Sequence, residues 1–175
     1  MNYITLATGT ILIMAFSWFF SLREKRYHGI ARFFSFESIF ILLLLNLKVW
    51  FKNPFSAYQV ISWIFLFASI YPGIAGFLTL HRKGSPEENH IERTTVLVKT
   101  GIYKYIRHPL YCSLFLLGTG IVFKEPARFQ LLLGAINLLA VYFTARMEEK
   151  EMIKKFGPEY IEYMHGTRMF IPYVL

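Results

Sequence analysis

Arg107-His108-Pro109-Leu110-Tyr111 opens an apolar run that continues to Phe123. The run from Leu110 to Phe123 has 14 residues, and as an α-helix it would be about 21 Å long. Proline is favoured at the first position of a helix, because the N–H that it lacks would have no partner there. The sequence therefore predicts a short apolar helix beginning at Pro109, with polar side chains gathered at its N-terminus.

Four further apolar segments surround this run, and they indicate that lipid is the solvent of the chain. Of the 175 residues, 55% are hydrophobic, more than is usual for a water-soluble domain. We predict an all-α fold, a polytopic membrane protein with five transmembrane helices, the last two forming a short hairpin, followed by a cytosolic helical tail. The expected spans are residues 3–22, 33–50, 58–80, 110–123 and 129–145. Residues 1–175 are expected to form a single membrane domain, with three spans in residues 1–80 and a polar loop, the hairpin and the tail in residues 81–175.

The basic residues are distributed unevenly between the two ends of these spans. The net charge is +8, and fifteen of the 19 lysines and arginines fall at one end. Lysine and arginine accumulate in cytoplasmic loops, so we expect the N-terminus outside and the long loop and the C-terminus in the cytoplasm. This distribution explains the charge without a nucleic-acid partner. The single cysteine, Cys112, excludes an internal disulfide and a cysteine-based metal site, and we expect no metal.

A second polar cluster, Glu148-Glu149, follows the last apolar segment and returns to the same side of the bilayer as Arg107 and His108. Arg107, His108, Tyr111 and a helix N-terminus would favour a carboxylate, whereas the glutamates would favour a cation or a hydroxyl. Together they predict a pocket for a zwitterionic ligand on the cytoplasmic rim. Two alternatives remain: Arg107 reaches lipid headgroups, and the glutamates begin a solvated helix. Glu37 is a further candidate, because an ionisable residue within a span is often functional.

Three motifs together carry a family resemblance. They are residues 99–111, the Glu148-Glu149 pair, and Phe156-Gly157-Pro158 with the five residues that follow. Over about residues 95–172 they resemble the isoprenylcysteine carboxyl methyltransferase and phospholipid methyltransferase superfamily of integral-membrane enzymes. The resemblance implies methyl transfer from S-adenosylmethionine to a lipophilic acceptor, a carboxylate, hydroxyl or amine, at the cytosolic membrane face. The cofactor would lie in a cytosol-facing pocket, and the lipid substrate would enter from the bilayer.

The resemblance also implies roles for individual residues. Apart from the resemblance, we expect Arg107 and Glu149 to be catalytic and Arg146 and Arg168 to bind the substrate. An amine acceptor must lose a proton, and Glu149 would then be the base. Where relatives carry an arginine four residues before the glutamate that matches Glu148, this chain has Thr144, which places a prenylcysteine substrate in question. The cofactor would be held by Thr95, Val96, Leu97, Val98, Gly101, Tyr103, His108, Pro109, Leu110, Tyr111 and Glu148.

Two other functions fit parts of the pattern. Membrane reductases of sterol or acyl chains, which use NADPH, are similar at Arg-His-Pro-x-Tyr and at a closing Phe-Ile-Pro such as residues 170–172. The adjacent glutamate pair favours methyl transfer over reduction. A non-enzymatic membrane subunit is the third alternative, and it predicts that the rim residues tolerate alanine.

Overall fold

The computed structural model describes residues 3–20, 28–84 and 95–172, and all the regular elements in these ranges are helical. The predicted all-α fold is thus confirmed. The expected end of the first span at Leu22 and residues 85–94 of the expected loop lie outside these ranges. The elements are α1 (Tyr3–Phe20), α2 (His28–Asn46), η2 (Leu47–Val49), α3 (Ala57–Lys83), η3 (Gly101–Lys104), α4 (Pro109–Val122), α5 (Arg128–Phe156) and α6 (Pro158–Gly166).

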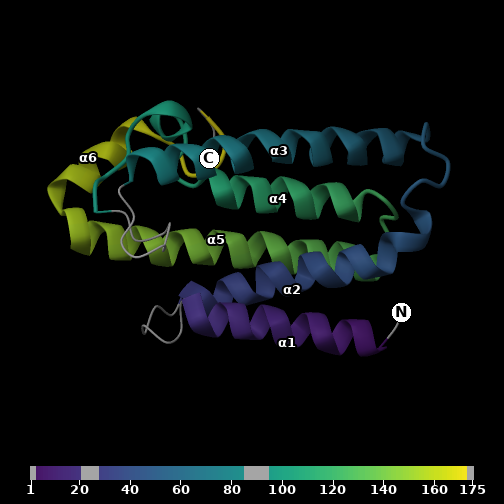
Figure 1. Ribbon diagram of the computed structural model, residues 1–175. Coiled ribbons are helices and arrows are strands. Elements are labelled where there is room, and N and C mark those ends of the chain that lie inside the picture. Colours follow the sequence, from purple (N-terminus) through teal and green to yellow (C-terminus); the bar gives the residue numbers. More distant parts are fainter. Residues whose placement is uncertain (1–2, 21–27, 85–94, 173–175) are drawn as a thin grey trace.

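The five longest helices lie side by side along one direction (Figure 1). α3 packs on α4, α5 packs on α2, and α1 lies on the outer side of α2. The N-termini of α2 and α4 and the C-termini of α3 and α5 meet at one end of this bundle, where α6 also lies. We call this the site end of the bundle.

Within the described residues, three helices are long and apolar enough to cross a membrane: His28–Val49, Ala57–Lys83 and Arg128–Phe156. Tyr3–Phe19 and Pro109–Val122 are apolar but shorter. Large apolar side chains such as Phe67 and Phe143 are exposed on the outside of the bundle, as expected where lipid replaces water. The number of crossings, five, stays a prediction.

The expected short hairpin is wrong in its second arm. α5 does not end at Ala145 but continues to Phe156, so that the hairpin has one short and one long helix. The polar segment after Ala145 is rich in Arg, Met, Glu and Lys, which are good helix formers, and it contains no glycine or proline. The helix ends where predicted, at Gly157, whose φ of +58° suits glycine, and α6 then begins at Pro158.

α2 begins at His28, five residues before the expected start at Phe33, so that Arg32 lies inside the helix. Polar side chains join α2 to α5: Ser35 Oγ donates to Asn137 Oδ1 over 2.7 Å, and His28 Nδ1 lies 2.9 Å from Glu151 Oε1. Interhelical hydrogen bonds of this kind stabilise helix packing in membranes. The α2–α5 interface therefore fixes which face of α2 is turned to the centre of the bundle.

Candidate functional site

The segment before α4 is held by the C-terminal tail. The Arg107 N–H donates to the Arg168 carbonyl over 2.8 Å, and the His108 N–H donates to the Met169 carbonyl over 3.1 Å. Arg168 donates back to the Tyr105 carbonyl over 3.1 Å. α4 then begins at Pro109, as predicted, and the rings of His108 and Tyr111 stack with their centroids 5.6 Å apart. Two segments that lie about sixty residues apart in sequence thus position the start of α4 together.

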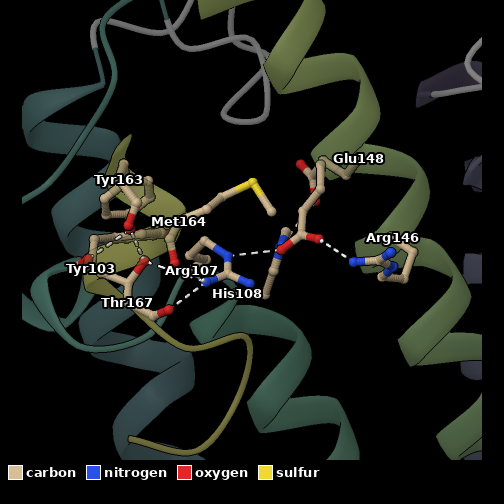
Figure 2. A network of polar contacts seen from close by, with 9 residues as sticks. Tyr103, Arg107, His108, Arg146, Glu148, Tyr163, Met164 and Thr167 are labelled. Atoms are coloured by element: carbon tan, nitrogen blue, oxygen red, sulfur yellow. Dashed lines mark hydrogen bonds and ion pairs between the residues drawn. The ribbon is translucent and has the colours of Figure 1, made fainter. Parts of the chain in front are cut away.

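The Arg107 side chain joins α5 to the tail (Figure 2). Its Nε donates to Glu149 Oε1 over 2.8 Å, and its Nη1 donates to the Thr167 carbonyl over 2.6 Å. The two charged side chains are only 9% and 2% exposed. Glu149 Oε2 also lies 3.3 Å from Arg146 Nη1. Arg107 and Glu149 therefore form a buried ion pair, which the Thr167 carbonyl and Arg146 extend on either side.

The imidazole of His108 lies between the two glutamates. Its Nδ1 is 3.5 Å from Glu148 Oε2, and its Nε2 is 3.5 Å from Glu149 Oε1, too far for a strong hydrogen bond. Burial by itself would lower the pKa of His108, but the Glu148 and Glu149 carboxylates outweigh burial and raise it. The structure thus brings together the two polar clusters that the sequence placed on one rim.

These residues border a cavity of about 340 Å³ at the site end of the bundle. Nine of the sequence-predicted site residues line it: Leu97, Val98, Tyr103, Arg107, His108, Pro109, Leu110, Tyr111 and Glu148. Glu148 is 17% exposed, in contrast to its buried neighbour Glu149. A cavity of this size is within the range of small-molecule sites, which are usually apolar with a few polar groups.

The other predicted site residues lie away from this lining. Thr95 and Val96 are exposed, and Gly101 begins η3 with φ +62° beside Thr79. The side chain of Arg146 is half exposed and pairs with Glu149. Arg168 is exposed and pairs with the segment before α4 through its backbone. Thr144, at the position where the resemblance leads one to expect arginine, is buried and donates to the Ala140 carbonyl over 2.6 Å.

Sequence reasoning missed several residues that line the cavity. Arg32 and Phe36 come from α2, which the sequence did not connect with the site, although His28, Arg32 and Ser35 share one helical face. Tyr160 and Tyr163 come from α6, and Tyr163 Oη donates to the Tyr103 carbonyl over 2.6 Å. Burial raises the pKa of both of these phenols, which therefore stay neutral. The lining residues without a sequence prediction are Arg32, Phe36, Leu80, Ser113, Leu114, Met152, Tyr160 and Tyr163.

Comparison with known families gives the site a context. A family model described as phospholipid methyltransferase matches residues 56–159, more than half of the chain. The chain belongs to the phospholipid methyltransferase family. The matched segment includes α3, α4 and α5 and thus the His108 and Glu148 walls of the cavity, whereas α2 precedes it and almost all of α6 follows it.

Individual relatives of this family member are methyltransferases. Protein-S-isoprenylcysteine O-methyltransferase of Saccharomyces cerevisiae is 37% identical over 95 residues, which cover 49% of this chain and 38% of the relative. The human protein of the same name is 32% identical over 93 residues, which cover 50% and 31%. Methanethiol S-methyltransferase 1 of Bradyrhizobium diazoefficiens is 29% identical over 89 residues, which cover 49% and 30%. The matches thus span about a third of the length of these curated relatives.

Proposed function

We propose that this chain is an integral-membrane methyltransferase that transfers a methyl group from S-adenosylmethionine to a lipophilic acceptor. One observation carries the proposal: His108 and Glu148 line the same cavity, in a chain that belongs to a methyltransferase family. Five membrane crossings with the N-terminus outside and the site in the cytoplasm complete the proposal, and the uneven charge distribution supports this orientation.

The residues present fit the two ends of a zwitterionic amino acid. Glu148 offers a carboxylate that lines the cavity and remains partly accessible, and it would accept hydrogen bonds from an amine or a hydroxyl. His108 Nε2 is buried and forms no hydrogen bond with the described residues, so it has a hydrogen-bonding position to offer. Leu97, Val98 and Tyr103 would enclose the apolar faces of the nucleoside.

When bound, S-adenosylmethionine supplies an electrophilic methyl group on a sulfonium. The chain's own contribution is to orient the reactants and exclude water, which strengthens every electrostatic interaction in the site. A carboxylate acceptor is already ionised and needs no base. For a protonated amine acceptor a base is required, but Glu149 already accepts a hydrogen bond from Arg107 and does not line the cavity. We therefore assign Arg107 and Glu149 to the positioning of His108 and Glu148 rather than to proton transfer.

Titration of the purified protein with S-adenosylhomocysteine tests the cofactor assignment. We expect saturable binding that falls about tenfold or more in Glu148→Gln, since a hydrogen bond to a charged group contributes on this order. Glu159→Gln is the matched control, because Glu159 is exposed in α6 and pairs with Lys99 outside the cavity. Absence of binding to the unmodified chain, or equal binding by the Glu148→Gln and Glu159→Gln variants, contradicts the proposal.

Methyl transfer itself is tested in membranes that contain the protein. Supply of S-adenosylmethionine with an isotopic methyl label should give labelled lipids, each heavier by one methyl group, and the Glu148→Gln variant should reduce the label strongly. Binding of NADPH in place of S-adenosylhomocysteine would instead favour the reductase that the sequence left open.

A further inference from the structure

Ser113 is a polar residue in the apolar part of the cavity lining. It lies on the second turn of α4, five residues after His108, and is therefore about 7.5 Å further into the bundle along the helix axis. The lining residues closest to it along α4 are apolar, and so are those of α2 and α3 on the next turns, namely Leu110, Leu114, Phe36 and Leu80. The proposed methyl transfer assigns Ser113 no role.

The Ser113 hydroxyl is not used in the packing of the bundle. A serine or threonine within a helix often donates to a carbonyl of its own preceding turn, and Ser69, Thr119 and Thr144 do so here. Ser113 Oγ forms no hydrogen bond with the described residues. The facing helix α3 leaves room for it, because a Cβ at Gly73 would come within 2.8 Å of Ser113 Oγ. The hydroxyl thus keeps its capacity both to donate and to accept at the wall of the cavity.

Several other polar groups of the lining gather around Glu148, on the α5 side of the cavity. His108 Nδ1 lies 3.5 Å from Glu148 Oε2, and burial together with the Glu148 carboxylate raises the pKa of the Tyr103 and Tyr160 phenols. Glu148, His108 and Tyr103 are the groups that would hold the cofactor. Ser113 lies apart from this cluster, among the apolar side chains that remain for the second reactant.

We infer that the Ser113 hydroxyl binds a neutral hydroxyl group of the methyl acceptor. A buried charge needs a counter-charge, which serine does not supply, whereas a serine hydroxyl both donates to and accepts from another hydroxyl. The acceptor is then a neutral amphiphile whose apolar chain lies along Phe36 and the leucines of α3 and α4. Ser113 positions the acceptor, whichever of its atoms is methylated. This inference rests on the proposed function, because it assumes that the cavity holds the methyl acceptor as well as the cofactor.

Photolabelling with an octanol analogue that carries a diazirine on its chain tests the inference. The protein is held in nanodiscs, with and without S-adenosylhomocysteine, and mass spectrometry of the digested chain identifies the labelled residues. Octanol, octanethiol and octane then compete with the label at equal mole fractions in the lipid. These competitors share one chain length and differ in the polar group, so that differences in protection report the hydrogen bond.

We expect label on α4 between Pro109 and Leu114, and protection by octanol at a mole fraction at least about threefold lower than by octane, because a neutral hydrogen bond contributes on this order. Octanethiol should resemble octane, since a thiol is a weak donor and a weak acceptor. Ser113→Ala should abolish the preference for octanol while the label remains, and Ser113→Thr, which keeps the hydroxyl, should retain it.

Thr119→Val is the matched control. Thr119 lies on the same helix, its hydroxyl donates to the Phe115 carbonyl over 2.8 Å, and it is not among the residues that line the cavity, so its loss should leave the preference intact. All variants are compared by melting temperature, and Ser113→Cys, which has nearly the shape of serine, replaces Ser113→Ala if alanine impairs folding. The affinity for S-adenosylhomocysteine should change less than about twofold in every variant, which is less than the loss of one hydrogen bond.

Four outcomes overturn the inference. The label is absent from α4, octanol and octane protect the unmodified protein equally, a folded Ser113→Ala variant keeps the preference, or Ser113→Ala loses S-adenosylhomocysteine binding, which would assign the hydroxyl to the cofactor. Failure of the unmodified protein to bind S-adenosylhomocysteine is a separate result and counts against the proposed function instead. The competition without S-adenosylhomocysteine tests the Ser113 hydroxyl in that case as well.

Discussion

The substitution Glu149→Gln tests whether the buried ion pair is structural. The Glu149 carboxylate accepts a 2.8 Å hydrogen bond from Arg107 and lies 3.3 Å from Arg146, in a position with 2% exposure. Loss of one partner of a buried pair usually costs about 3–5 kcal/mol, because the other charge is left uncompensated. Glutamine keeps one acceptor oxygen, and Arg107 keeps its bond to the Thr167 carbonyl. We therefore expect Glu149→Gln to lower the free energy of unfolding by about 2–3 kcal/mol, no more than the lower end of that range.

For a chain of this size, each kcal/mol lowers the melting temperature by about 2–4 °C, so the expected fall is about 4–12 °C. The melting of detergent-purified protein can be followed by tryptophan fluorescence. The adjacent substitution Glu148→Gln is the matched control, because Glu148 is more exposed and lines the cavity. It should change the melting temperature by less than about 2 °C while it weakens S-adenosylhomocysteine binding.

A double variant sharpens the same prediction. Arg107→Met combined with Glu149→Gln should destabilise the protein by clearly less than the sum of the two single changes. Glu149→Gln alone leaves the buried Arg107 without a carboxylate, and Arg107→Met alone leaves Glu149 with the half-exposed Arg146 as its arginine partner. Any of three results would contradict a structural role for the ion pair. Glu149→Gln would have the melting temperature of the unmodified protein, Glu148→Gln would lower the melting temperature by as much as Glu149→Gln, or the effects of Arg107→Met and Glu149→Gln would simply add.

Three further predictions concern other parts of the molecule. Gly120→Ala would place a Cβ 3.0 Å from the Leu66 backbone nitrogen and should destabilise the α3–α4 packing by about 1–3 kcal/mol in melting experiments, whereas Gly166→Ala, with nothing within 4 Å, should be neutral. The Glu148 and Glu149 carboxylates raise the pKa of His108 in the folded protein. The stability that protonated His108 contributes should therefore be complete below about pH 6.5 and be lost as the pH rises through the raised pKa. His108→Asn should remove this pH dependence from the melting temperature. Lys124→Met removes an ammonium 3.6 Å from the Trp63 ring centre and should cost about 1–2 kcal/mol with altered tryptophan emission, and unchanged emission contradicts that contact.

Local signals in the sequence located several element boundaries. Pro109 predicted the start of α4, and Gly157-Pro158 predicted the break between α5 and α6, because each depends on the conformations that proline and glycine allow. The expected lengths of α2 and α5 were wrong, because each apolar run was taken as the whole helix. α2 begins earlier and includes Arg32 in its N-terminal part, and α5 continues past its apolar run through Glu148. An apolar run shows which residues face lipid or the core, whereas the helix-forming residues beyond the run and the first glycine or proline determine where the helix ends.

The sequence predicted the part of the candidate site that depends on neighbouring helices, but not the part that depends on packing between distant segments. The sequence placed the His108 and Glu148 clusters on one rim, since two consecutive antiparallel helices bring their distant ends together. It could not predict that α2 and α6 supply further walls, because these contacts depend on packing between segments that are far apart in the chain. The exposure of Thr95 and Val96, which were expected at the cofactor, has the same origin: a family pattern fixes their order in the chain but not the path of the loop.

Part of the cavity lining lies inside the segment that the family model matches and part lies outside it, and we expect the outside part to influence which acceptor is bound. The matched segment, residues 56–159, supplies His108 and Glu148, which would hold a common methyl donor, whereas Arg32 and Phe36 precede it and Tyr160 and Tyr163 follow it. The named relatives differ in the atom that they methylate, oxygen in one case and sulfur in the other. A family that keeps one donor and varies its acceptors would place the variation in walls that the shared segment does not supply. We therefore expect exchanges at Arg32 and Phe36 to change which acceptor is bound, and exchanges at Glu148 to reduce methyl transfer to all acceptors alike.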